Sequence, residues 1–141
     1  MEKKAHTVKN LVITDSKNLI VYISNTVSGR IHDKKLADSL DSKKNLLLNG
    51  DLGFWGFKHD KIKIKMPHKK PKGKELTEEQ KAENKQHSSS RVKIEHVFAH
   101  LKTIRILKDK LRNYKLNFNH LIMEIGAKLY NFKTIHNQAL S

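Results

Sequence analysis

Cysteine is absent from the 141 residues, which excludes disulfide bonds and thiolate metal sites. Long apolar runs are also lacking, since none approaches the roughly 20 residues that a transmembrane helix needs. The first residues, Met-Glu-Lys-Lys-Ala-His, have no apolar signal-peptide core. No nucleotide-binding glycine loop and no serine or cysteine nucleophile signature occurs. We therefore expect a cytoplasmic protein with no membrane partner.

Acidic residues are few beside the basic ones: 14 Asp and Glu face 29 Lys and Arg, a formal charge of +15. The excess is concentrated in residues 57–115, where eighteen cations and seven acids give +11. Such a segment suggests a polyanionic partner, most often nucleic acid bound through its phosphates. The alternative is a basic surface that has no partner.

The first half of the chain shows short apolar runs separated by turn residues. Residues 8–13 and 19–24 flank a turn and predict an antiparallel hairpin, whose second strand is apolar enough for burial on both faces. Residues 32–40 predict a short helix, and Leu-Leu-Leu at 46–48 predicts a central strand. The order of elements predicts an α/β fold with a small mixed sheet and flanking helices.

The chain ends in a predicted helix over residues 117–138. Its apolar positions recur at helical spacing and form one seam, made of Phe118, Ile122, Ile125, Leu129 and Phe132. With 37% hydrophobic residues, the chain can build one compact domain and hardly two. We expect a single domain over 1–141.

Residues 58–75 form the basic segment, which has eight lysines and one aspartate up to position 74. Ile62, Ile64 and Met66 alternate with lysines, which predicts an edge strand with one basic face. The lysines expected to contact DNA are Lys61, Lys63, Lys65, Lys69 and Lys70. A capping box at 77–80 opens a helix that either stops near 85 or continues into the next one.

Residues 88–104 predict a further helix, with Ile94, Val97, Phe98, Leu101 and Ile104 on one face. Arg91, Glu95 and Lys102 occupy a neighbouring stripe, so one carboxylate lies between two cations at the edge of the buried face. The simplest interpretation is an Arg–Glu pair worth a few tenths of a kcal/mol. A site carboxylate is the other interpretation.

Asp51 directly follows the predicted central strand, and open α/β sheets place their sites at such strand ends. Asp51 and Glu95 together could hold Mg²⁺ or Mn²⁺, which prefer carboxylate and water ligands. Two-metal phosphodiester chemistry normally needs a third acid. Asp33 is a candidate, although the favoured interpretation is that it charges the first turn of its helix.

Two other groups of side chains could have a function. His96 and His100 are four residues apart and could bind Zn²⁺, but the pattern is not that of a metalloprotease, and a metal role is disfavoured. Phe54, Trp55 and Phe57 could stack on bases, but packing beneath the sheet is favoured.

Five short motifs occur in an order that resembles the DDE transposases of bacterial insertion sequences. They are residues 4–10 (Lys-Ala-His-Thr-Val-Lys-Asn), 28–33 (Ser-Gly-Arg-Ile-His-Asp), 49–54 (Asn-Gly-Asp-Leu-Gly-Phe), 67–77 (Pro-His-Lys-Lys-Pro-Lys-Gly-Lys-Glu-Leu-Thr) and 91–96 (Arg-Val-Lys-Ile-Glu-His). The resemblance covers nearly the whole chain.

This resemblance implies a ribonuclease-H-like fold in which two Asp and one Glu hold a divalent metal. Such enzymes nick transposon ends and join the freed 3′ hydroxyl to target DNA. Asp51 matches the second acid and Glu95 the third, while Arg91 and Lys102 match positions that flank the site.

The first acid of the family lies on a strand ahead of the hairpin, and that strand has no counterpart here. We therefore expect an incomplete, carboxy-terminal part of the catalytic domain that is inactive alone. Its partners would be DNA and the missing amino-terminal half or a second copy. The rival hypothesis is a non-catalytic basic protein that binds nucleic acid.

Overall fold

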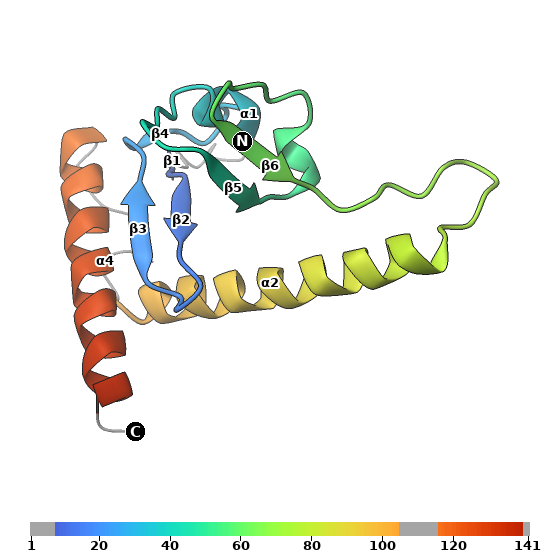
Figure 1. The fold of residues 1–141 in the computed structure, drawn as a ribbon. Coiled ribbons are helices and arrows are strands. Elements are labelled where there is room, and N and C mark those ends of the chain that lie inside the picture. The colour runs from blue at the N-terminus through green and yellow to red at the C-terminus, as the bar shows by residue number, and fades with distance from the viewer. Residues whose placement is uncertain (1–7, 105–115, 140–141) are drawn as a thin grey trace, which may run out of the picture. The chain divides into compact units, whose positions relative to one another are not determined.

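The computed structural model describes residues 8–104 and 116–139, drawn as a ribbon in Figure 1. The chain divides into two compact units, Met1–Ile31 with Ile94–Ser141, and His32–Lys93. The basic residues at 105–115 lie outside the described part. The division into two compact units does not test whether residues 1–141 form a single domain, so that expectation stays a prediction.

The first unit contains the predicted hairpin. β2 (Val12–Thr14) pairs antiparallel with β3 (Ile20–Ile23), and the short β1 (Val8–Lys9) pairs antiparallel with β4 (Val27–Ser28). The Asp15 carboxylate accepts hydrogen bonds from the amides of Lys17 and Leu19, which closes the turn. The hairpin prediction is confirmed.

Two helical segments supply the rest of the first unit's core. α2 (Glu78–Thr103) places Val97 and Leu101 in it, and α4 (Leu116–Ala139) places Ala127 there, against Ile20 of β3. α4 and β3 lie side by side in Figure 1 and are in contact. α2 is one continuous helix of 26 residues, so the second of the two alternatives for its start is confirmed.

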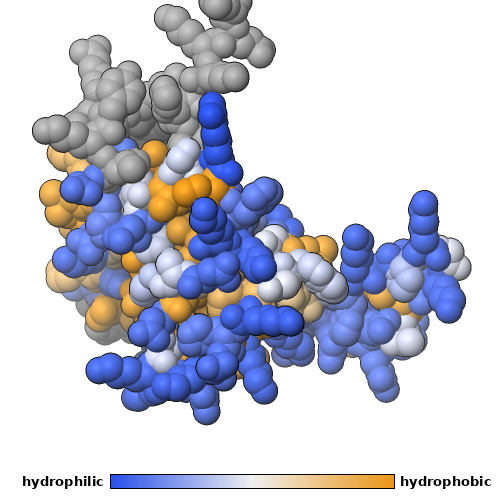
Figure 2. Space-filling model, turned by 90° about the horizontal axis from the view of Figure 1, so that it is seen from above, coloured by the Kyte–Doolittle hydropathy of each residue, from blue (hydrophilic) through white to orange (hydrophobic). Residues whose placement is uncertain are grey.

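Two burial predictions in this unit are wrong. Of the seam predicted for the last helix, Ile122 is buried at 7%, but the other four residues are exposed, up to 71% for Phe132. Figure 2 shows hydrophobic side chains at the surface on the side of α4. The face against the sheet instead carries Ala127, whose small side chain permits close approach. β3 is not buried on both faces, because Val21 is 61% exposed.

The second unit is built on a parallel strand pair. α1 (Asp33–Ala37) is followed by β5 (Leu46–Asn49), the short 3₁₀ turn η1 (Leu52–Phe54) and β6 (Ile62–Lys65). β5 and β6 pair in parallel, from Leu46 opposite Ile62 to Asn49 opposite Lys65. The core-facing side chains include Leu36, Ala37, Leu40 and Ile62.

β5 was predicted to be a central, buried strand, and this is wrong for the described part of the chain. β6 is its sole partner there, and the Leu47 side chain is 73% exposed. Parallel strands are normally covered on both faces. Among the described residues, however, this pair has an exposed apolar side chain at Leu47, and the outer edge of each strand has no strand partner. Within the described residues, no helix has the length and apolarity that crossing a membrane requires.

Candidate functional site

Asp51 stands two residues beyond the end of β5, as the sequence predicted. Its Oδ1 accepts a hydrogen bond from the Leu52 amide at 2.6 Å and caps η1, and the side chain is exposed. No further hydrogen bond or ion pair to this carboxylate occurs in the described part of the chain. One oxygen of Asp51 is therefore available to a ligand.

Gly50 allows the backbone next to Asp51 to lie close to the neighbouring strand β6. The Gly50 amide donates to the Lys65 carbonyl at 2.9 Å, which extends the β5–β6 ladder by one step. A Cβ at this position would lie 2.5 Å from Cγ2 of Ile64, closer than packed atoms allow. The absence of a side chain at 50 is thus what lets the backbone beside Asp51 pack against β6.

Asp33 lies beside the turn that follows Asp51. It occupies the first turn of α1, as favoured from the sequence, and its Oδ2 is 3.0 Å from where a Gly53 Cβ would be. The helix N-terminus favours a negative charge at Asp33. The contact with Gly53 brings a second carboxylate to the turn after β5, a proximity that the sequence did not reveal.

Glu95 lies on α2 with the two cations predicted to accompany it. Arg91, Glu95 and Lys102 are all exposed, while Val97 and Leu101 of the same helix are buried. The predicted arrangement, a charged stripe beside an apolar face, is confirmed. Asp51 and Glu95 belong to different units, so their closeness stays a prediction.

Among the described residues, the candidate metal ligands are not gathered into a three-ligand group. Within residues 8–104 and 116–137, no three His, Asp or Glu side chains stand close enough to share an ion. His100, whose spacing from His96 suggested a zinc ligand, meets the Tyr130 ring edge-on with centroids 5.9 Å apart. The carboxylates of Asp51 and Glu95 remain the donors whose chemistry suits Mg²⁺ or Mn²⁺.

The basic segment has the predicted form of a strand with one charged face. Ile62 is 3% exposed, and Lys61, Lys63 and Lys65 are exposed. Lys69 and Lys70, in the connection that follows, are exposed as well. All five lysines are therefore accessible to a polyanion.

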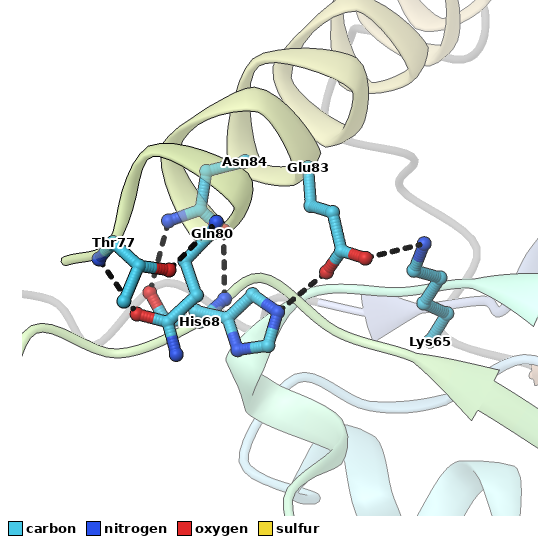
Figure 3. A network of polar contacts seen from close by, with 6 residues as sticks. All are labelled: Lys65, His68, Thr77, Gln80, Glu83 and Asn84. Atoms are coloured by element: carbon cyan, nitrogen blue, oxygen red, sulfur yellow. Dashed lines mark hydrogen bonds and ion pairs between the residues drawn. The ribbon is translucent and has the colours of Figure 1, made fainter.

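A polar network ties this connection to the start of α2 (Figure 3). Asn84 binds both backbone groups of His68: its Oδ1 accepts from the His68 amide at 2.7 Å, and its Nδ2 donates to the His68 carbonyl at 3.1 Å. The His68 ring bonds the Glu83 carboxylate through Nε2 at 2.6 Å, and Lys65 Nζ lies 3.9 Å from the other oxygen of Glu83.

Charge and burial shift the pKa of Glu83 in this network and of His87, which lies near it. The hydrogen bond from His68, followed by the positive charge of Lys65, lowers the pKa of Glu83. Burial, followed by the same lysine charge, lowers the pKa of His87, one turn further along α2. The Glu83 carboxylate is thus kept ionised and the His87 imidazole neutral over a wider pH range than usual.

Sequence reasoning found the capping box but not this network. The Thr77 amide donates to Gln80 Oε1 at 3.1 Å, and the Gln80 amide donates to Thr77 Oγ1 at 3.3 Å, as the capping box predicts. His68 and its partners are 15 and 16 residues apart. No local spacing rule joins residues at such distances, so the sequence carried no signal for them.

Known proteins share the sequence pattern of this chain. The profile of the DDE superfamily endonucleases matches residues 1–131. A probable transposase for insertion sequence element IS702, from Microchaete diplosiphon, is 33% identical over 130 residues, which make up 91% of this chain and 47% of the relative. The chain therefore spans about half the length of this curated relative. No solved structure matches this chain.

Proposed function

Because the chain belongs to the DDE superfamily endonucleases, we propose that it is the DNA-binding, acid-bearing part of a transposase that cuts transposon ends and joins them to target DNA. The observation that carries this proposal is the position of Asp51, exposed after β5 and beside the lysine-bearing strand β6. A site for phosphodiester chemistry needs an acid and a phosphate-binding surface in such proximity.

Asp51 and Glu95 are proposed as two of the three metal-holding acids. Asp51 offers an oxygen that no described residue occupies, and carboxylate oxygens are the donors that Mg²⁺ and Mn²⁺ prefer. When bound, such an ion activates a water or hydroxyl and stabilises the leaving oxygen. Arg91 and Lys102, on the helix of Glu95, supply positive charge for the phosphates at the reacting bond.

We propose a ribonuclease-H-like fold that is completed by a further strand carrying the first acid. The antiparallel hairpin and the parallel pair β5–β6 are the two kinds of pairing that a mixed sheet contains. Leu47 is exposed, and the outer edge of β5 has no partner strand among the described residues, so such a strand could add there. The part of a transposase of the relative's length that this chain does not cover would supply it.

The test compares the 141-residue chain with a longer protein that includes the reading frame upstream of Met1. Each is incubated with Mn²⁺ and labelled DNA carrying the ends of the insertion sequence. We expect Asp51→Asn and Glu95→Gln each to abolish nicking by the longer protein and to leave its DNA binding intact. DNA binding without cleavage by any form would favour a non-catalytic basic protein instead.

A further inference from the structure

The connection between β6 and α2 is attached at both of its ends. Asn84 and Glu83 bind His68 at the first end, and the capping box of Thr77 and Gln80 fixes the second. Residues 69–76 therefore form a closed loop whose two ends are held by the first turns of one helix. Figure 3 shows both attachments within one close view.

The interior of this loop has defined local structure too. The Lys74 amide donates to the Pro71 carbonyl at 3.4 Å, and Gly73 has a φ of +77°. A glycine in the left-handed region at the third position is what a type II turn requires. Proline and a closed turn both reduce the number of conformations that the loop must give up when it binds a partner.

Four lysines project from this short loop, and their charge is not neutralised locally. Lys69, Lys70, Lys72 and Lys74 are exposed, and no ion pair to any of them occurs in the described part of the chain. On the right of Figure 2, where this loop and the start of α2 lie, hydrophilic side chains dominate the surface. Lys65 differs, because the Glu83 carboxylate faces it at 3.9 Å.

We propose that Asn84, together with the His68–Glu83 hydrogen bond, is a clamp that presents the lysines of loop 69–76 to the phosphates of duplex DNA. The inference rests on the proposed function and assigns its DNA contact mainly to the loop. Asn84, His68 and Glu83 are positioning residues in this scheme, since the lysines make the contact. A preformed loop binds more tightly than a mobile one with the same charge, because less conformational entropy is lost.

The test measures binding of the 141-residue chain to a labelled 30-base-pair duplex of arbitrary sequence at several salt concentrations. Replacing the four loop lysines by Ala should reduce the slope of log affinity against log salt by about 0.9 for each lysine that binds a phosphate. Asn84→Ala leaves the charge unchanged and should weaken binding by roughly three- to tenfold, because the loop is no longer preorganised. Gln86→Ala, an exposed neutral position on the same helix, is the matched control and should bind as the parent does.

The Glu83→Gln variant distinguishes the effect of the clamp on DNA binding from the effect of net charge. The amide oxygen can still accept the hydrogen bond from His68 Nε2, while the negative charge beside Lys65 is removed. We expect this variant to bind DNA at least as tightly as the parent. Tighter binding by Glu83→Gln together with parent-like binding by Asn84→Ala would show that charge alone sets the affinity, and would contradict the clamp.

Limited trypsin digestion reports the state of the loop independently of DNA. Cleavage after Lys72 and Lys74 should be faster in Asn84→Ala than in Gln86→Ala, because the loop has lost its first attachment. Faster cleavage with unchanged DNA affinity would show that the clamp exists but does not serve binding, which overturns the inference and leaves the proposed function standing. A parent chain with no affinity for DNA would overturn both.

Discussion

Asn131 of α4 exchanges two hydrogen bonds with the backbone of Ile20 in β3. Its Oδ1 accepts from the Ile20 amide and its Nδ2 donates to the Ile20 carbonyl, both at 2.8 Å. The two residues are 111 positions apart, so this pair joins the first strands to the last helix. The same device recurs in the other unit, where Asn84 binds both backbone groups of His68.

Replacing Asn131 by Ala should destabilise the Ile20 contact measurably. The change leaves a partly buried amide and carbonyl of Ile20 without partners, which costs about 1–3 kcal/mol for such groups. Urea unfolding followed by circular dichroism gives the free energy of unfolding. Asn137→Ala, at an exposed position of the same helix, is the control and should change it by less than about 0.5 kcal/mol.

The 141-residue chain by itself should not nick transposon-end DNA. Asp51 and Glu95 supply part of a two-metal ligand shell, and Mg²⁺ binds poorly to an incomplete one because it requires near-octahedral geometry. The measurement is cleavage of labelled DNA with Mn²⁺ by this chain and by its Glu95→Gln variant. Nicking by the parent that disappears in Glu95→Gln would show that the chain already holds a complete set of acids.

Replacing Lys61, Lys63 and Lys65 of β6 by Ala should flatten the salt dependence of DNA binding. The slope of log affinity against log salt falls by about 0.9 for every phosphate that is no longer neutralised. The slope should fall less for Lys65→Ala alone than for Lys63→Ala alone, because Glu83 already faces Lys65. An unchanged slope in the triple variant would exclude β6 as a contact surface.

Acidification should weaken the second unit in two stages. The folded chain lowers the pKa of His87 and of Glu83, so the unfolded chain binds more protons at low pH. The stabilising contribution of each group is fully present above the pKa that the group has in the unfolded chain, and it is lost as the pH falls below that value. The loss begins below about pH 6.5 for His87 and below about pH 4.3 for Glu83. Unfolding measured from pH 7.5 to 3.5 should show the upper stage missing in His87→Gln and the lower one missing in Glu83→Gln.

Gly50→Ala should destabilise the strand end that carries Asp51. The new Cβ would meet Cγ2 of Ile64 at 2.5 Å, and overpacking of this kind costs about 1–3 kcal/mol. Gly53→Ala should cost less, because its neighbour at 3.0 Å is the mobile end of the Asp33 side chain. In a double-mutant cycle, Ile64→Ala should relieve part of the loss at Gly50. Additive effects would contradict the contact.

Features with a local cause could be predicted from the sequence. Alternation of lysine and isoleucine predicted the two faces of β6, and the Thr77–Gln80 spacing predicted the start of α2. The position of Asp51 after a strand followed from three leucines and a glycine. In each case neighbouring residues alone determine the structure, so a short stretch of sequence contains the information.

Neighbouring residues alone did not determine which face of α4 packs against the core. Five large apolar side chains marked one face, yet of these Ile122 alone is buried, and the small residue Ala127 contacts the core. Close approach to β3 favours small residues, and only the partner surface reveals where that approach occurs. The same applies to the asparagine pairs, which join residues 16 and 111 positions apart.

The two faces of β6 have different roles: one supports the backbone beside Asp51, and the other carries lysines. The pairing register of β6 with β5 determines the position of both faces at once. Ile64, opposite Leu48, packs against Gly50 before the acid, while Lys63 and Lys65 alternate with it. A shift of one residue exchanges the faces of a strand, so it would displace the acid's support and turn the cations inward together. An insertion or deletion within 62–65 should therefore abolish both properties at once, whereas one in the preceding loop at 57–60 is absorbed. Length changes in descendants of this gene are expected to accumulate in that loop and to be absent from the strand.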